Sequence, residues 1–254
     1  MSLIQSGIYN TIMSPALYNL TSYTQVVLLN SGVVGQHTVT IPSNVFHIDV
    51  ECIGGGGSGG GASLIHQGGS GGNGGSYGRA YLSVNPGEVY GYTIGSGGTG
   101  NLSQNNIVGN HTSFSSLTNV VIVQGRAGNA GGVGVGDILY DGGVGGAGVN
   151  SASPQTGGGG GAANSLGVGG NGSTSNGVGG VGPAGIAGPG TWSNAGAGGD
   201  GFAAASNNQG PGTVGNSYGG GGGGSSASFQ PSNQPGGNGA TGGIRISYTA
   251  STIT

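Results

Sequence analysis

Hydrophobic and polar residues alternate in only a few short segments of this chain. The clearest is 45–53, in which residues 46–52 alternate strictly between apolar and polar. A period of two predicts a half-buried strand with one face against a core. We expect the apolar face to be Phe46, Ile48, Val50 and Cys52, and the opposite, solvated face to be His47, Asp49 and Glu51.

Five other segments have strand character. Residues 38–41 are a β-branched run that ends at Pro42, and proline cannot continue a central ladder. The apolar runs 80–84 and 89–94 flank the turn sequence Asn85-Pro86-Gly87, which predicts a hairpin. The last two are 112–123 and the C-terminal run in which Ile244, Ile246 and Tyr248 share one face opposite Arg245 and Ser247.

Long blocks of glycine separate these segments, and 69 of the 254 residues are glycine. The longest block, between Gly125 and Gly243, has neither a helical nor an alternating period, and each interior glycine costs an α-helix about 1 kcal/mol relative to alanine. We expect extended helices of the polyproline II type, with three residues per turn. Because such helices have no internal hydrogen bonds, they must pair their backbone groups with neighbouring helices, at a distance that only glycine allows.

Residues 1–36 differ from the rest, since they hold three glycines and have no clear period before the strand-like Gln25–Leu29. We therefore predict an N-terminal attachment segment at 1–36 and a glycine-rich β/polyglycine domain at 37–254. The predicted fold class is all-β: a small β-sheet or sandwich framework with a packed polyglycine II-type bundle and little or no helix.

Charged side chains are rare: three arginines, six acids and no lysine, for a net charge of −3. Nucleic-acid binding needs a basic surface and a P-loop needs lysine, so we expect no nucleic-acid partner. The longest aliphatic runs, Val26–Leu29 and Val120–Val123, are far below the ~20 residues of a membrane span, so we expect no membrane insertion. The first basic residue is Arg79, so the charged region of a secretory signal is missing.

Candidate chemistry is sparse. His47, Asp49 and Glu51 are residue types that bind metals, but a solvated strand face explains their spacing better, and we expect no metal and no cofactor. Cys52 alternates with apolar residues and is expected to be a small buried hydrophobe rather than a nucleophile. The remaining acids are dispersed, without a readable pair of catalytic carboxylates. We do not expect an enzyme.

Short aromatic and polar islands interrupt the second glycine block. A packed glycine helix has no room for these side chains, so we expect them in loops at the bundle ends, where recognition residues usually lie. Aromatic rings beside serine and asparagine suit saccharides or protein loops, and padding of the bundle is the alternative. The candidate receptor-binding residues are Tyr140, Asp141, Trp192, Phe202, Tyr218 and Phe229.

The order of these segments resembles a glycine-rich domain common in tail and fibre proteins of bacteriophages. The matching features are His37–Pro42, Val45–Gly57, the hairpin Tyr81–Gly95, the stretch Thr112–Phe114 and the closing strand Gly243–Tyr248. Glycine runs that alternate with aromatic islands are also similar to the tip adhesins of T-even phages, in which loops between polyglycine helices bind an outer-membrane receptor. Residues 1–36 do not resemble the fibre-attachment domain of those adhesins.

The resemblance implies a virion surface protein, a tail-fibre or tail-tip adhesin that recognises a host cell-surface protein or glycan through its loops. Residues 1–36 would contact other virion proteins, and self-association into a homo-oligomer is an open alternative. The location would be the extracellular virion, which fits the missing secretory signal because virions leave by lysis. The alternative is a non-catalytic structural subunit, either a capsid decoration or minor capsid protein or part of an extracellular filament.

Overall fold

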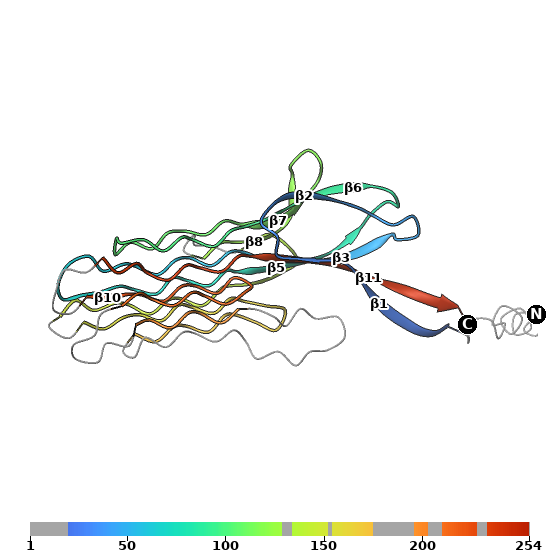
Figure 1. The fold of residues 1–254 in the computed structure, drawn as a ribbon. Coiled ribbons are helices and arrows are strands. Elements are labelled where there is room, and N and C mark those ends of the chain that lie inside the picture. Colours follow the sequence, from blue (N-terminus) through green and yellow to red (C-terminus); the bar gives the residue numbers. More distant parts are fainter. Residues whose placement is uncertain are drawn as a thin grey trace, which may run out of the picture.

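The computed structural model describes residues 20–128, 134–151, 154–174, 196–202, 210–227 and 233–253. This part of the chain contains eleven β-strands and no helix, which confirms the all-β prediction. The strands gather toward one end of an elongated molecule, and glycine-rich segments run side by side to form the other end (Figure 1). Within the described residues, no helix is long and apolar enough to cross a membrane.

Two antiparallel sheets form a sandwich. The first has five strands in the order β1 (Leu20–Ser31), β11 (Gly243–Ile253), β3 (His47–Ile53), β5 (Tyr77–Ser83) and β9 (Ile138–Tyr140). The second has four, in the order β2 (Gly35–Thr40), β6 (Val89–Ile94), β7 (Thr112–Ser115) and β8 (Val121–Gly125). A separate two-stranded sheet, β4 (Gln67–Gly68) with β10 (Ser226–Ala227), lies at the far end of the glycine-rich region (Figure 1).

The sandwich core is built from the faces that the alternation predicts. Ile48, Val50 and Cys52 of β3 pack with Ile244 and Ile246 of β11 and with residues of the four-stranded sheet. The rings of Tyr90 and Phe114 stack with their centroids 4.9 Å apart. Each of these side chains is at most 8% exposed. Phe46 is the exception at 59% exposed, because β3 begins one residue after it.

A three-residue repeat of hydrogen bonds organises the glycine-rich region. Within segment 54–62, every third N–H donates to the same neighbouring segment. Gly54, Gly57 and Gly60 donate to carbonyls within 70–76, at 3.1, 2.9 and 2.8 Å. The residues one place later donate to 103–110, and those two places later donate to 234–240. A repeat of three is the period of a polyproline II-type helix, so these segments form the predicted polyglycine II-type bundle.

Segment 54–62 also accepts hydrogen bonds from three further segments, which gives it neighbours on all sides. The donors are Gly98, Gly128 and Gly222, each from a different segment. Segment 219–227 is surrounded in the same way, because its N–H groups bond to 210–216, 157–160 and 57–60. The bundle therefore includes the first glycine block, whereas the sequence pattern predicted these helices only between Gly125 and Gly243.

Close packing of the backbones explains why this region is glycine. A Cβ added at Gly56 or Gly222 would fall closer than 3.0 Å to a carbonyl oxygen of the adjacent segment, Gly220 and Gly237 respectively. Most bundle glycines meet the same obstacle from neighbouring backbone. Any side chain would push two segments apart and break the hydrogen bonds between them.

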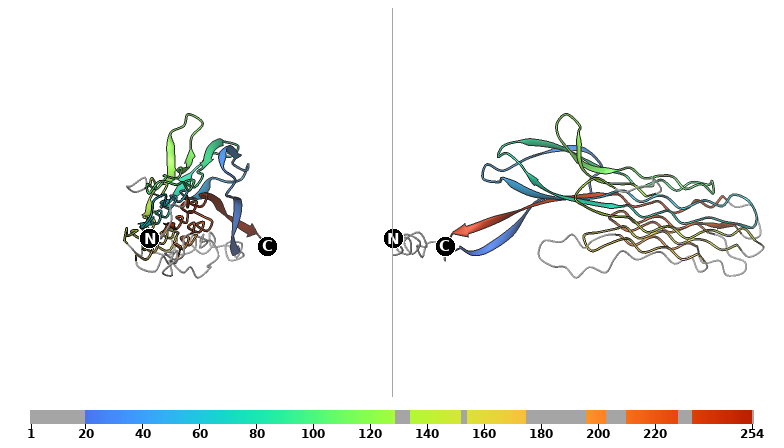
Figure 2. Two further views of the ribbon diagram at one scale, coloured as in Figure 1. Left: turned by 60° about the vertical axis from the view of Figure 1, so that its left-hand side comes forward. Right: turned by 180° about the vertical axis from the view of Figure 1, so that it is seen from behind.

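The two regions are continuous along the chain. Strands β3 and β5 lead into bundle segments at their Ile53 and Tyr77 ends, and a second apolar cluster of Ile53, Tyr77, Ala162 and Ala163 seals the junction. At the other end, β1 and β11 form a ribbon that projects away from the sandwich (Figure 2). Strand β1 lies within the predicted attachment segment, and β2 already begins at Gly35; the proposed boundary at residue 36 stays a prediction.

Candidate functional site

The end of the bundle opposite the ribbon carries the loops that reverse the glycine-rich segments. Three of them, residues 63–67, 101–106 and 149–151, meet there, and we call this group the distal tip. It lies at the opposite end of the molecule from the outer ends of β1 and β11, Leu20 and Ile253 (Figure 1). Loops on a packed scaffold are the usual place for recognition.

Asn150 holds the three loops together. Its Oδ1 accepts hydrogen bonds from Gly68 N at 3.1 Å and from Gln104 Nε2 at 2.9 Å. Ser151 N also donates to the carbonyl oxygen of His66, at 3.1 Å. The loops therefore brace one another, and their arrangement is set before any ligand arrives.

Two of the loops, 63–67 and 101–106, are also closed internally. In 63–67, Gln67 Oε1 accepts hydrogen bonds from Ser63 N and Leu64 N, at 3.0 and 2.9 Å, and His66 takes a left-handed backbone with φ of 64°. In 101–106, Asn101 Oδ1 accepts from Ser103 N at 2.9 Å. Side-chain oxygens that bond to nearby N–H groups are typical of turns made by asparagine and serine.

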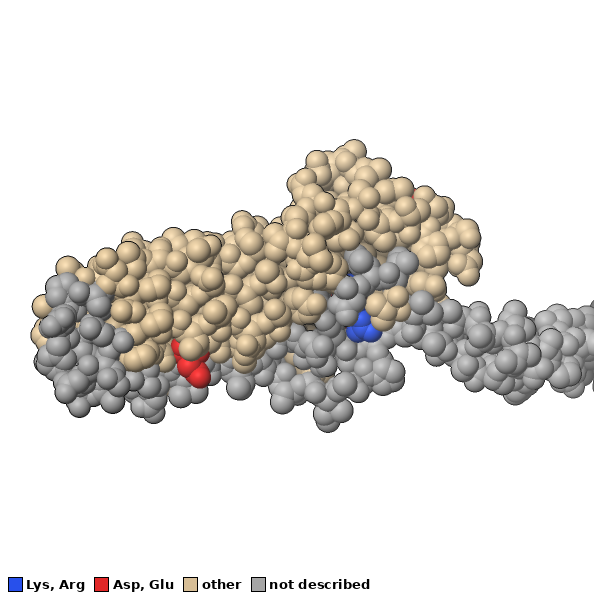
Figure 3. All heavy atoms as spheres, in the orientation of Figure 1, with Lys and Arg blue, Asp and Glu red and all other residues tan. Residues whose placement is uncertain are grey.

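The surface of the distal tip combines aliphatic and amide groups. Leu64 is 61% exposed, and Ile65 and Leu102 are each 42% exposed. No residue of the distal tip is Asp, Glu, Lys or Arg, and the face drawn in Figure 3 carries only isolated patches of charge. The chemistry offered is neutral: apolar contact, amide and hydroxyl hydrogen bonds, and one imidazole.

The structure separates the predicted receptor-binding residues. Tyr140 lies in β9, not in a loop, so the prediction of its loop position is wrong; its ring stacks on Tyr77 with centroids 6.1 Å apart. Tyr218 packs against the same junction cluster, and Asp141 is exposed directly after β9. Trp192 and Phe229 lie outside the described residues. A binding role for any of these residues stays a prediction.

Phe202 is the described candidate that lies near the distal tip. Its ring covers Gly210, where an added Cβ would meet it, and its carbonyl oxygen accepts a hydrogen bond from Thr156 Oγ1 at 2.7 Å. Gly210 N donates to Ser226 of β10, and β10 pairs with β4 beside loop 63–67. Its half-buried ring therefore packs on this backbone, and the choice between padding and binding stays a prediction.

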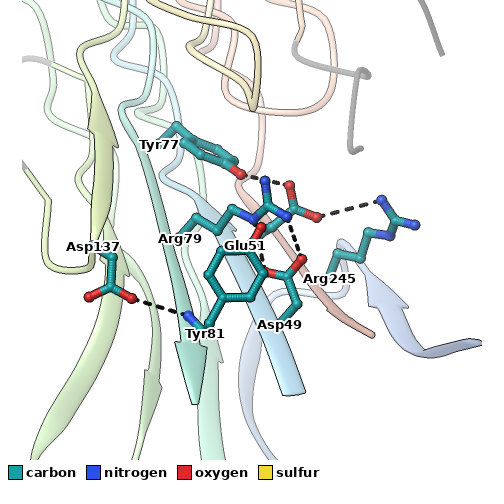
Figure 4. Close-up of polar contacts among 7 residues, drawn as sticks. All are labelled: Asp49, Glu51, Tyr77, Arg79, Tyr81, Asp137 and Arg245. Atoms are coloured by element: carbon teal, nitrogen blue, oxygen red, sulfur yellow. Dashed lines mark hydrogen bonds and ion pairs between the residues drawn. The ribbon is translucent and has the colours of Figure 1, made fainter. Parts of the chain in front are cut away.

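Asp49 and Glu51 correct the prediction of a solvated strand face, because they are 7% and 0% exposed. Arg79 on β5 donates to both carboxylate oxygens of Asp49, at 2.9 and 2.6 Å. Tyr77 Oη donates to Glu51 Oε1 at 2.6 Å, and Arg245 Nη1 of β11 lies 3.5 Å from Glu51 Oε2. Figure 4 shows the cluster across the three strands.

Register explains how these charges meet. Glu51 lies directly opposite Arg245 on β11 and Arg79 on β5, so one row across the sheet reads Arg, Glu, Arg. Burial raises the pKa of the Glu51 carboxyl despite the hydrogen bond from Tyr77. Burial likewise raises the pKa of Tyr77. A slip of one residue would turn the charged side chains toward the apolar core, so the row fixes strand register.

The titratable groups beside this row are buried, paired or isolated from one another. Cys52 is 0% exposed and burial raises the pKa of its thiol, which confirms it as a small buried hydrophobe. His47 is exposed and lies 3.4 Å from Ser83 Oγ through its Nδ1, while both acids are committed to arginine or tyrosine. Over the described ranges, no three His, Cys, Asp or Glu side chains lie close enough to hold a metal ion.

The sequence pattern missed the distal tip because none of its residues is aromatic. The signal was present in two polar islands between glycine runs, Ser63–Gln67 and Asn101–Asn106. Both lack charge and glycine, and both are rich in side chains that close turns.

Comparison with known proteins places most of the chain in one family. A sequence-family model described as a glycine-rich domain matches residues 31–249. No curated protein matches the chain. The match confirms the glycine-rich domain; the tie to phage tail fibres stays a prediction.

Proposed function

The chain belongs to the glycine-rich domain family, and from that premise we propose that it is a virion surface protein, a bacteriophage tail-fibre or tail-tip adhesin. It acts without catalysis, at the surface of the extracellular particle. Its distal tip contacts a host cell-surface protein or glycan, and residues 1–36 face other virion proteins.

One observation carries the proposal: the braced loops and the ribbon lie at opposite ends of an elongated molecule, with the bundle and the sandwich between them (Figure 1). A protein that is anchored at one end and recognises a surface at the other needs this separation. Because Asn150 and Gln67 already fix the loops, binding costs little ordering entropy.

The chemistry of the distal tip favours a neutral ligand. Its exposed Leu64 and Leu102 offer apolar contact, and its amide and hydroxyl groups offer hydrogen bonds. Salt screens interactions between charges, and the tip has no Asp, Glu, Lys or Arg, so binding should change little with ionic strength. A ligand recognised through phosphate or sulfate groups would show the opposite behaviour.

The test is saturable binding of the labelled full chain to a panel of bacterial strains, with unlabelled protein as competitor. We expect binding to some strains only. L64S and L102S should weaken it at least tenfold, which corresponds to about 1.4 kcal/mol. W192A and F229A test the sequence-predicted residues in the same assay.

The matched control is L166S. Leu166 is 45% exposed but belongs to the turn that follows Ala163 of the junction cluster, at the opposite end of the bundle. L166S should bind as the unmodified chain does. Equal binding by L64S, L102S and L166S would reject the distal tip as the site, and no binding of the folded chain to any strain would reject the adhesin.

A structural virion or filament subunit is the second candidate, and the uncharged edge strand β1 favours it. The two candidates differ in copy number. Quantitative mass spectrometry of the native particle should find few copies for an adhesin and many for a decoration or filament subunit.

A further inference from the structure

The outer part of the β1–β11 ribbon has no third strand among the described residues. Strand β3 pairs with β11 only as far as Ser247, opposite Asp49. Beyond that point, β11 pairs with β1 alone, from Gln25 opposite Thr249 to Leu20 opposite Ile253. We call residues 20–25 and 249–253 the terminal ribbon. It projects clear of the sandwich in both views of Figure 2.

An isolated two-stranded ribbon is marginally stable in water. Independent stability takes a third strand or a packing layer. The terminal ribbon has the length of a regular strand pair but neither of these supports within the described chain. Residues 22–27 pair in unbroken register with 247–252, between register shifts at Leu20/Ser22 and Val27/Leu29, so this stretch of β1 is the part that can accept a further strand.

Among the strands that the structure describes, β1 is also the longest open edge. It has 12 residues and ends the five-stranded sheet, whereas the other outer strands, β9, β2 and β8, have three, six and five. Along an edge strand, unpaired N–H and C=O groups are ready to bond to another strand. The edge of β1 is therefore the largest backbone surface available for strand addition.

Soluble proteins protect edge strands with charged residues, proline or bulges. Strand β1 has two register shifts, at Leu20/Ser22 and Val27/Leu29, but the stretch between them has none of these protections. Residues 20–31 and 246–253 contain no charge, no proline and no glycine, in a chain where glycine supplies 69 of 254 residues. Val27 of β1 is 47% exposed. The polar residues of these two segments, mostly serine and threonine, are uncharged.

We propose that β1 pairs antiparallel with β1 of a second copy of this chain, about a two-fold axis. A second copy is the occupant because it brings the same open edge, and a two-fold axis makes any antiparallel strand complementary to itself. With no charges on β1, no like charges oppose each other across the pair. The two five-stranded sheets then join into one, and the two bundles extend away from the shared ribbon. This inference does not depend on the proposed recognition function; it assigns β1, within the predicted attachment segment, to a second copy and leaves residues 1–19 for contacts with other virion proteins.

The test is the mass of the full-length chain in solution by light scattering, at micromolar concentration and below. We expect a dimer of twice the 23.8 kDa chain mass. S22K/T24K, which places two charges on the open edge, should give monomers at the same concentration. The control L117K adds one charge at a 63% exposed position in the β7–β8 turn and should remain dimeric.

Hydrogen exchange gives a readout that needs no variant. Protection of the amides of residues 20–25 should rise with protein concentration, in step with dimer formation. A monomeric unmodified chain, a larger oligomer, a dimer unaffected by S22K/T24K, or protection that is independent of concentration would each overturn the proposal. Protection gained only on adding other virion proteins would also overturn it and assign the edge to one of them.

Discussion

The interior of the sandwich is filled by side chains, whereas the interior of the bundle is filled by backbone. In the sandwich, alternating side chains such as Val50, Phe114 and Ile246 fill the space between two sheets. In the bundle, the interior is backbone, and the N–H and C=O groups of segments 54–62 and 219–227 bond to neighbours on all sides. The sandwich should therefore be sensitive to removal of side-chain atoms, whereas the bundle should be sensitive to the addition of a single carbon.

The difference also explains the division of roles that we propose. A bundle of backbone segments places no demand on side chains except that they be absent, so its loops are free to vary. A sandwich needs particular side chains in its core and in its charge row. In this arrangement, the bundle is the part on which a recognition surface can change without loss of the fold.

The strongest test of the contrast is one added methyl group in the bundle. In G222A, the new Cβ would fall closer than 3.0 Å to the carbonyl oxygen of Gly237. Overpacking costs about 1–3 kcal/mol where neighbours can shift. Here the neighbour is hydrogen-bonded backbone, so we expect a loss above about 3 kcal/mol in denaturant unfolding.

The matched control is G91A in β6 of the sandwich. A Cβ there meets only the Ser115 hydroxyl at 3.3 Å, which can rotate, and no backbone atom closer than 3.9 Å. Because glycine is unfavourable within a strand, G91A should be neutral or slightly stabilising. Equal destabilisation by G91A and G222A would contradict the account of the bundle.

A smaller effect is expected from the row of charged residues Arg79, Glu51 and Arg245 in the sandwich. R245M leaves the buried Glu51 Oε2 without its arginine at 3.5 Å, and breaking a buried ion pair costs about 3–5 kcal/mol. We expect about 3 kcal/mol at neutral pH, since Tyr77 still donates to Glu51. The loss should shrink in acid.

The sign follows from linkage. Burial raises the pKa of Glu51 in the folded state, so the folded chain holds the proton more tightly than the unfolded chain does. That stability is fully present below the ordinary pKa of 4.5 and is lost as pH rises through the raised value. The double variant E51Q/R245M should be more stable than R245M at neutral pH. A destabilisation of R245M that grew in acid would refute this role for Glu51.

The smallest effect concerns the boundary between the two regions. His111, just before β7, accepts a hydrogen bond from Ala127 N through Nδ1 at 3.0 Å. Burial, with the nearby Arg126 charge, lowers the pKa of His111, so the folded state favours the neutral ring. Stability should fall as pH drops below 6.5, by less than about 1 kcal/mol, the worth of one neutral hydrogen bond.

H111N removes the titration and is the comparison for this prediction. The range from pH 7 to pH 5 includes the ordinary histidine pKa of about 6.5. Over this range, the stability of H111N should change less with pH than that of the unmodified chain. Thermal unfolding across the series measures the difference. Parallel curves would show that His111 does not link protonation to folding.

Sequence reasoning worked where the physics is local. The alternation through Ile48, Val50 and Cys52 located a strand and its buried face, since each residue's side is set by its neighbours along the chain. It failed at Asp49 and Glu51, because their partners Arg79 and Arg245 come from other strands and only the register brings them together. The local pattern alone does not distinguish a polar side chain in solvent from one that is buried against a charged partner.

The glycine blocks and the distal tip show the same limit. Composition predicted helices paired through their backbones, but not that segment 54–62 would lie at the centre, since that depends on which segments meet. The sequence-based prediction relied on aromatic residues and therefore selected Tyr140 and Tyr218, which pack at the junction. The distal tip is defined by contacts between loops distant in sequence, such as Gln104 with Asn150.

Amide hydrogen exchange of the native chain tests the central claim most directly, that the bundle is a core made of paired backbone. We expect the amides of 54–62 and 219–227 to exchange as slowly as those of β3 and β11, at the rate of global unfolding. Segments without strand ladders ordinarily exchange fast, so this result would be specific to mutual hydrogen bonding. Exchange of these amides at the rate of open loops, while β3 stays protected, would contradict the account.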